Sequence, residues 1–284
     1  MSPLLQSNRS PLFAIAGCAL LGISLLALSS ISMAADETID SDLQQAINGD
    51  HRSESNRARD QYRKPLETLS WLGIRPYMTV VEITPGAGWY TEILAPYLKR
   101  EGTFYAAGFD AESKIDFFRR NAKKFKEKLA ADPDVYGRVI LSEIAPPTKT
   151  EIAPAGSADM VLTFRNVHNW MKAGNSDAML AAIYTALKPG GILGLVEHRG
   201  NPDVKQDPEA KSGYVNEAYA IAMVEKAGFK LIGKSELLAN PEDSRDHPHG
   251  VWTLPPTLRL GHKDQSKYRA IGESDRMLLK FVKK

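Results

Sequence analysis

Short apolar segments alternate with segments of helical periodicity along most of this chain. Runs rich in β-branched and aromatic residues predict seven strands, at 77–84, 102–108, 135–141, 158–164, 191–197, 229–237 and 276–282. Apolar residues three and four positions apart predict helices from Trp89, from Asp110 as N-cap, at 177–187 and at 216–227. Strands and helices that alternate in this way favour a mainly parallel sheet with right-handed crossovers.

The last two predicted strands have only turn-rich sequence between them, so they could pair antiparallel as a terminal hairpin. Before the strand at 191–197, Lys188-Pro189-Gly190-Gly191 predicts a helix stop and a tight turn. No internal repeat or low-complexity linker interrupts residues 76–284. The expected fold is therefore α/β, with a doubly wound, mainly parallel seven-stranded sheet and a C-terminal antiparallel hairpin strand in one domain.

Residues 1–35 differ from the rest of the chain. They carry one charge, Arg9, followed by an apolar run at 12–28 and by small residues at Ser32 and Ala34. This order predicts a signal peptide cleaved after Ala34, and hence export, most simply to a bacterial periplasm. Because the apolar run is slightly longer than a usual signal core, a retained N-terminal membrane anchor is an alternative.

The single cysteine and the charge balance limit the possible catalytic groups and the possible partners. Cys18 lies in the removable segment and also resembles a lipoprotein cleavage site, which is a second alternative for the N-terminus. A chain without this segment has no disulfide, thiolate nucleophile or cysteine metal ligand. The formal net charge of +2 does not favour nucleic acid. We expect a small-molecule partner, and no stable membrane contact unless the N-terminal segment is retained.

A turn with two glycines follows the first predicted strand directly. Glu82 lies near the end of the strand, and Gly86 and Gly88 come just before the helix. Such a turn presents backbone amides to a ligand, as in nucleotide-type cofactor sites. It also occurs wherever a strand bends tightly into a helix, so the turn alone leaves both interpretations open.

Basic residues gather in two helical segments. In the polar segment 36–75 they alternate with acidic residues, and Pro65 is expected to break or restart the helix there. This segment is predicted to be a solvated helix packed on the domain, or a lid over a cofactor or an acidic substrate. The Arg and Lys residues of the helix after Asp110 are expected to form a solvated face rather than a binding patch.

Polar side chains follow the fourth and fifth predicted strands, where parallel strands present their carboxyl ends to one crevice. His168 in the first group is a candidate base or orienting group, with a capping or structural role as the alternative. Glu197 and His198 in the second are further candidates, although Glu197 could instead pair with Arg199 or Arg165.

A histidine pair lies later in the chain, in Asp246-His247-Pro248-His249. Together with His198 it could suggest a metal site, because imidazole and carboxylate are good ligands. The short spacing with proline between the histidines is not a strong ligand pattern. We therefore expect no metal, and a loop over the active site is the alternative for this segment.

Taken in order, these motifs resemble those of class I S-adenosylmethionine-dependent methyltransferases, and more narrowly the signal-peptide-bearing bacterial type. The resemblance covers about 57–283 and depends on an ordered set of segments: 80–88, 159–170, 187–191 and 227–229. It implies S-adenosyl-L-methionine as the cofactor. The methionine end would lie at Glu82, Thr84, Gly86 and Gly88, with Asn166 nearby.

Two positions depart from the family pattern. Thr84 replaces the first glycine of the turn and Pro85 follows it; threonine can leave its backbone amide free, whereas proline cannot donate. At the end of the second strand the family places a carboxylate on the ribose, but Gly108 stands there and Asp110 comes two residues later. Asp110 could take that role or act as a helix cap.

The resemblance also implies roles for other side chains near the cofactor. Glu143, after the third strand, is expected at the adenine amino group, with a solvent-exposed turn residue as the alternative. Trp89 and Tyr90 could place a π face near the sulfonium, or belong to the core.

The function expected from the resemblance is in-line methyl transfer to an unidentified acceptor, with His168, His198 and Glu197 as candidate catalytic residues. An exported, non-catalytic protein that binds an adenosyl ligand is the alternative. An NAD-dependent dehydrogenase is disfavoured because Thr91 stands where that fingerprint has its third glycine.

Overall fold

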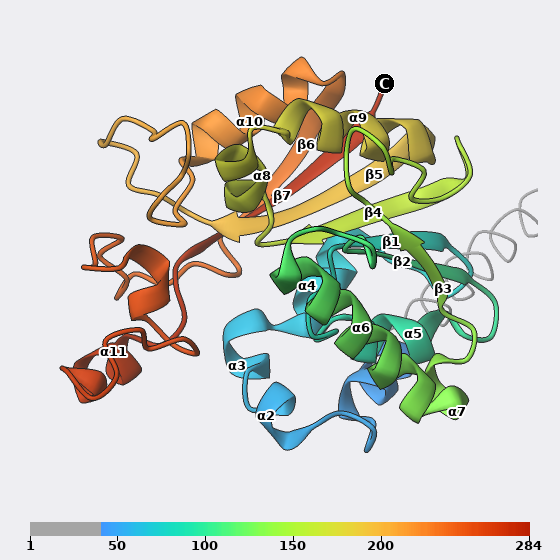
Figure 1. The fold of residues 1–284 in the computed structure, drawn as a ribbon, viewed down its shortest axis with the longest axis horizontal. Helices are drawn as coiled ribbons and strands as arrows, with labels where there is room; N and C mark the ends of the chain where they lie inside the picture. Colours follow the sequence, from blue (N-terminus) through green and yellow to red (C-terminus); the bar gives the residue numbers. More distant parts are fainter. Residues whose placement is uncertain (1–40) are drawn as a thin grey trace, which may run out of the picture. The chain divides into compact units, whose positions relative to one another are not determined.

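A seven-stranded sheet lies at the centre of residues 41–284, the part of the chain that the computed structural model describes (Figure 1). The strand order is β3-β2-β1-β4-β5-β7-β6. The strands are β1 (Thr79–Ile83), β2 (Thr103–Gly108), β3 (Ile140–Glu143), β4 (Ala158–Phe164), β5 (Leu187–His198), β6 (Phe229–Ser235) and β7 (Arg276–Lys283). The predicted signal peptide at 1–35 lies outside the described residues.

Strand direction follows the expected pattern. The pairs β1–β2, β1–β4, β2–β3 and β4–β5 are parallel, whereas β7 is antiparallel to both β5 and β6. The predicted α/β fold with a C-terminal antiparallel hairpin is therefore confirmed. The order reverses between β1 and β4, and ligands of such sheets bind beyond the carboxyl ends of the strands at this point.

Helices cover both faces of the sheet. Figure 1 shows α8, α9 and α10 on one face and α4, α5 and α6 on the other. The helices are α2 (Glu54–Arg57), α3 (Asp60–Arg63), α4 (Pro65–Leu72), α5 (Thr91–Leu98), α6 (Asp116–Ala131), α7 (Pro133–Tyr136), α8 (Val167–Ala173), α9 (Ser176–Ala186), α10 (Glu217–Lys226), the short 3₁₀ helix η1 (Gly250–Thr253) and α11 (Gln265–Ile271). Within residues 41–284, no helix is both long and apolar enough to cross a membrane.

Alternate residues of β1 face opposite layers, as strand geometry requires. Val81 and Ile83 belong to the main apolar core, which contains residues of α8, α9 and α10. Glu82 points to the other layer, where it meets α5. Two apolar layers therefore hold β1 and fix the position of the glycine turn that follows it.

The third predicted strand is wrong at its start. Asp132 accepts a hydrogen bond from the N–H of Val135 and caps α7, with Pro133 in the first turn, so Tyr136 is helical. The strand begins only at Ile140. Because β3 is the edge strand and Ile140 and Leu141 are exposed, burial does not mark its ends in the sequence.

Two further boundaries also differ from the predictions. The helix before 188–191 does stop at Ala186, but β5 already begins at Leu187 and passes through the predicted turn as a register irregularity opposite β4. The predicted helix from Asp110 begins at Asp116 instead, with Ile115 at the N-cap. The alternative prediction that Asp110 caps this helix is therefore wrong.

The segment before β1 consists of separate short helices. Lys64, with φ 39°, divides α3 from α4, and Pro65 starts α4, as predicted. The sequence between β6 and β7 is not only turns, because it also contains η1 and α11. Both segments reach the carboxyl edge of the sheet through the contacts described below.

Candidate functional site

Glu82 anchors the start of the glycine turn. Its side chain is buried, and Thr91 at the start of α5 donates a hydrogen bond of 2.6 Å to its carboxylate. Burial raises the pKa of Glu82 to about 7, although the hydrogen bond from Thr91 and the charge of Lys128 oppose this rise. The carboxyl group therefore titrates near neutral pH and joins β1 to α5 across the turn.

The turn itself has a left-handed backbone at three positions: Thr84 at φ 48°, Gly86 at φ 61° and Gly88 at φ 80°. Such a conformation is strained for a β-branched residue such as Thr84, whereas glycine adopts it freely. The amide of Thr84 donates to the carbonyl of Ala107 at 2.8 Å. The expectation that this amide is free for a ligand is therefore wrong.

Gly86 and Gly88 differ in the space around them. A side chain at Gly86 would meet nothing within 4 Å, whereas one at Gly88 would lie 3.1 Å from Phe125 of α6. Within the described chain, the amides of Gly86 and Ala87 have no hydrogen-bond acceptor. Gly86 and Ala87 thus present donors to open space, and Gly88 allows α6 to pack closely.

Lys128 is an exception to the solvated face predicted for α6. Its ammonium donates to the carbonyl of Ala87 at 2.9 Å and to the carboxylate of Glu92 at 2.6 Å. It thereby fixes the glycine turn from the side of α6. Nothing local in the sequence distinguishes Lys128 from the other basic residues of this helix.

Asp110 and Glu143 lie together beyond β2 and β3. Lys149 donates to both carboxylates, at 2.6 Å to Asp110. Asp110 also accepts from the amide of Glu112, and Glu143 accepts from the amide of Ala111 at 3.0 Å. The hydrogen bond from Lys149 is the main reason why the pKa of Asp110 is lowered. The two predicted cofactor carboxylates are therefore neighbours, held by a lysine that sequence reasoning missed.

Asn166 ties the end of β4 to the end of β1. Its amide nitrogen donates to the carbonyl of Ile83 at 2.9 Å and to Thr163 at 3.2 Å. A second tie is the ring stack between Tyr90 and Phe164, whose centroids are 3.5 Å apart. The glycine turn and the polar residues after β4 are thus held at one edge of the sheet.

Trp89 faces the N-terminal segment. Its indole N–H donates to the carbonyl of Asn56 at 2.9 Å, and the guanidinium groups of Arg52 and Arg63 lie 5.0 and 4.4 Å from its ring centroid. The cations on this ring are thus arginines of the chain. Trp89 and Tyr90 are both buried, in agreement with the core alternative.

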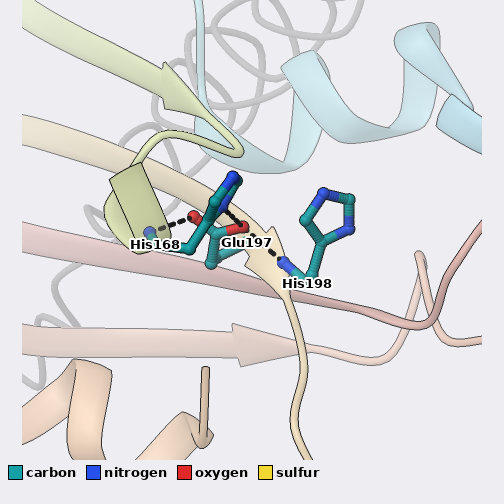
Figure 2. Close-up of side chains that lie close together, drawn as sticks. All are labelled: His168, Glu197 and His198. Atoms are coloured by element: carbon teal, nitrogen blue, oxygen red, sulfur yellow. Dashed lines mark hydrogen bonds and ion pairs between the residues drawn. The ribbon is translucent and has the colours of Figure 1, made fainter. Parts of the chain in front are cut away.

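His168, Glu197 and His198 converge from the ends of β4 and β5 (Figure 2). Nδ1 of His168 lies 3.0 Å from one oxygen of Glu197, and the backbone amide of His168 donates to the other at 3.1 Å. The backbone amide of His198 also donates to Glu197, at 2.8 Å. Glu197 is fully buried and serves these groups. The alternative that it pairs with Arg199 or Arg165 is wrong.

His198 is held from the other side. Its Nδ1 lies 2.5 Å from the hydroxyl of Ser274, just before β7. Burial lowers the pKa of His198 well below 6.5, and His168 and Arg276 lower it further. His198 is therefore neutral at pH 7. Its ring centroid lies 5.5 Å from that of His168, and the ring centroid of Trp252 in η1 lies 6.0 Å from that of His168.

The histidines at 247 and 249 do not form a metal site with His198, but another group of possible ligands lies at the site. His247 hydrogen-bonds to Asp243 at 2.8 Å and His249 is exposed, so neither joins His198. Ligand atoms of His168, Glu197 and His198 do lie within 4.8 Å of one another. However, both oxygens of Glu197 already accept hydrogen bonds, and the positive charge of nearby arginines lowers the pKa of His198. This charge disfavours a divalent cation.

Several residues at this edge were missed because the sequence gives no local signal for them. They come from the segment before β1 and from either side of β7: Arg59, Arg63, Glu273, Ser274 and Arg276. Trp252 follows the segment 246–249, for which a loop over the site was one prediction.

Comparison with known proteins identifies the fold. No family model matches the sequence, and no curated protein matches it. The structure is similar to a SAM-dependent methyltransferase from Aquifex aeolicus, at 15% identity and a TM-score of 0.53, over 79% of this chain and 92% of that one. A protein assigned as a sarcosine dimethylglycine methyltransferase from Galdieria sulphuraria aligns at 12% identity and a TM-score of 0.52, over 81% and 86% of the two chains. The chain has the fold of class I methyltransferases.

Proposed function

We propose that this protein is an S-adenosylmethionine-dependent methyltransferase that acts on a small-molecule acceptor. One observation carries the proposal: the ligand-facing glycine turn and the His168–Glu197 pair are joined at one edge of the sheet, through Asn166 and through Phe164. A cofactor loop and an oriented base are thus neighbours. The fold and the Aquifex aeolicus neighbour support this interpretation.

The residues at the glycine turn fit the cofactor. Gly86 and Ala87 offer two backbone donors in open space, and Glu82 is placed for the positively charged amino acid end. Asp110 and Glu143 are paired beyond β2 and β3, where the ribose and adenine are expected. S-adenosylmethionine supplies a methyl group that its sulfonium already activates for displacement.

His168 is the proposed base. Because the carboxylate of Glu197 accepts at Nδ1, the neutral imidazole of His168 carries its proton on that nitrogen and has Nε2 as its acceptor. Nε2 can then take the proton that an acceptor oxygen or nitrogen must lose. His198 remains neutral and can orient the same acceptor by a hydrogen bond. Burial of these groups excludes water from the transfer.

The proposal is tested with a labelled cofactor. Purified protein is incubated with metabolite extract and S-adenosylmethionine that carries a labelled methyl group. We expect label in a small-molecule product and formation of S-adenosylhomocysteine. Neither label nor S-adenosylhomocysteine above the level of a heat-inactivated control would contradict the proposal.

The alternative function, a non-catalytic protein that binds an adenosyl ligand, is favoured by one feature. The amide of Thr84 is already used by Ala107, and Pro85 has no amide proton, so the turn offers fewer donors than the family pattern. Binding of S-adenosylhomocysteine without any methyl transfer to the extract would favour this alternative.

Export is also part of the proposal, with a membrane anchor or a lipoprotein at Cys18 as the alternatives. It is supported by the apolar run at 12–28 and the small residues before Ala35. N-terminal sequencing of the protein from a periplasmic fraction is expected to start at Ala35. An intact N-terminus in the cytoplasmic fraction would contradict export.

A further inference from the structure

Four arginines gather beside the two histidines; we call them the arginine cluster: Arg59, Arg63, Arg165 and Arg276. Arg59 contacts one oxygen of Glu273 at 2.5 Å, and Arg63 lies 3.8 Å from the other. Arg276 also pairs with Glu273. Arg165, directly after β4, acts electrostatically on Arg63 and is acted on by Arg276. Three of the four guanidinium groups thus share the carboxylate of Glu273, and Arg165 has no salt bridge with it.

Arg63 is buried and Arg165 is half-buried, and neither has a full set of hydrogen-bond partners. Arg63 is 2% exposed, and in residues 41–284 its Nε and Nη1 atoms have no hydrogen-bond acceptor. Arg165 has neither a side-chain hydrogen bond nor a salt bridge anywhere in the described part of the chain, and its backbone is left-handed at φ 60°. A bound ligand would account for both features, the strained backbone of Arg165 and the unsatisfied N–H groups of Arg63.

Arg52, in the same segment, is better satisfied than Arg63, although its Nε also lacks a hydrogen-bond acceptor among the described residues. It is also buried, at 1% exposed, but it donates two hydrogen bonds of 2.8 Å to the carboxylate of Asp60 and one of 2.7 Å to the carbonyl of Ile47. Such a bidentate pair balances the charge within the protein. The contrast with Arg63, which lies near the same indole ring, singles out the arginine cluster.

The cofactor does not balance this charge. Its amino acid end has one carboxylate and one ammonium group, and the sulfonium adds a further positive charge. Glu82, the buried acid at the glycine turn, has a pKa of about 7 and is only partly ionised at neutral pH. The cofactor therefore adds to the positive charge, and the compensating anion must come from another ligand.

We propose that the acceptor carries an oxyanion, a carboxylate or phosphate group, which the guanidinium groups of Arg165 and Arg63 bind beside His168. This inference rests on the proposed function, because it names the substrate class of that site. Guanidinium groups bind both oxyanions bidentately, which would fix the orientation of the methyl-accepting atom. This proposal agrees in part with the prediction that residues 36–75 form a lid over an acidic substrate, because Arg63 in α3 would contact that substrate.

The test uses inorganic phosphate as the probe and the full-length protein. Calorimetric titration in the presence of saturating S-adenosylhomocysteine is expected to show one saturable phosphate site. Arg165→Gln is expected to weaken phosphate at least about tenfold, because a charge-assisted pair of hydrogen bonds is lost. Arg165→Lys should recover part of the affinity. Arg269→Gln, which removes an exposed arginine on α11, is the matched control and should leave phosphate binding unchanged.

The outcomes separate this inference from the proposed function. If S-adenosylhomocysteine binds but phosphate does not, or binds equally well to Arg165→Gln and Arg269→Gln, the oxyanion site is wrong and the methyltransferase proposal stands. If S-adenosylhomocysteine does not bind, the proposed function fails and the acceptor role of the arginine cluster fails with it. A circular dichroism spectrum of each variant, equal to that of the wild type, establishes that it is folded.

Discussion

The carboxyl edge of the sheet has two halves that balance their charges differently. In the loop half, beyond β1, β2 and β3, Lys149 serves Asp110 and Glu143, and Lys128 lies beside the glycine turn. In the histidine half, beyond β4, β5 and before β7, the arginine cluster shares Glu273. The loop half is close to neutral and suits a cofactor, whereas the histidine half has an excess of positive charge and suits an anionic acceptor.

The halves also differ in which groups are strained. The loop half has a β-branched residue, Thr84, in a left-handed turn, and a buried acid, Glu82, with a raised pKa. The histidine half has a fully hydrogen-bonded carboxylate, Glu197, and arginines, Arg63 and Arg276, that keep unsatisfied N–H groups. Substitutions in the two halves should therefore separate: those in the histidine half should affect turnover, and those in the loop half should affect cofactor affinity and stability.

The largest expected effect is that of His168→Ala. Loss of the base should lower kcat by about 100-fold or more, because general base catalysis typically contributes that much. The affinity for S-adenosylhomocysteine should change little, since His168 belongs to the histidine half. Steady-state kinetics with the acceptor and calorimetry measure the two quantities. His262→Ala, an exposed histidine, is the control; equal kcat in both variants would remove His168 from the mechanism.

Glu82→Gln should change the pH dependence of stability. In the folded protein the pKa of Glu82 is about 7, above its ordinary value of 4.5, so the folded state keeps a proton that the unfolded state loses. The free energy of unfolding of the wild type should fall as the pH rises from 4.5 to 7, by about 3 kcal/mol from this group.

The glutamine variant lacks this dependence. The free energy of unfolding of the variant minus that of the wild type should therefore be about 3 kcal/mol larger at pH 8 than at pH 4.5, so the variant gains stability relative to the wild type as the pH rises. Urea unfolding at the two pH values measures it. An equal difference at both pH values would show that Glu82 is not protonated in the folded protein near neutral pH.

The smallest effect is expected from Thr84→Gly. Glycine adopts the left-handed backbone of Thr84 without strain, so the free energy of unfolding should rise by up to about 1 kcal/mol in spite of the flexibility that glycine adds. Thr257→Gly, at an exposed position without a left-handed backbone, is the control and should lose stability. Equal losses in both variants would show that Thr84 is not strained.

Burial decides how much of the fold can be predicted from the sequence. The prediction for 158–164 agrees with β4, because almost every residue there is buried between two layers and the apolar run marks both ends. At the edge strand β3 that signal is absent, since Ile140 and Leu141 are exposed. The start of β5 was also not predicted, because a proline and two glycines occur within the strand where its register with β4 is irregular.

The candidate site divides in the same way. His168, Glu197 and His198 were predictable because His168 comes just after β4 and the other two end β5, and parallel strands end at one edge. Arg63 and Ser274 were not, because they approach that edge only through tertiary folding. The amide of Thr84 was assigned wrongly, since its acceptor, Ala107, lies on the neighbouring strand.

The most direct measurement for the central claim is a calorimetric titration of S-adenosylhomocysteine into the wild type and Gly86→Val. A valine at Gly86 would occupy the open space at the turn and impose a left-handed backbone on a β-branched residue. We predict saturable binding to the wild type and affinity lower by about tenfold or more in the variant, which is 1.4 kcal/mol or more. No binding to the wild type, or equal binding to both proteins, would contradict a cofactor site at the glycine turn.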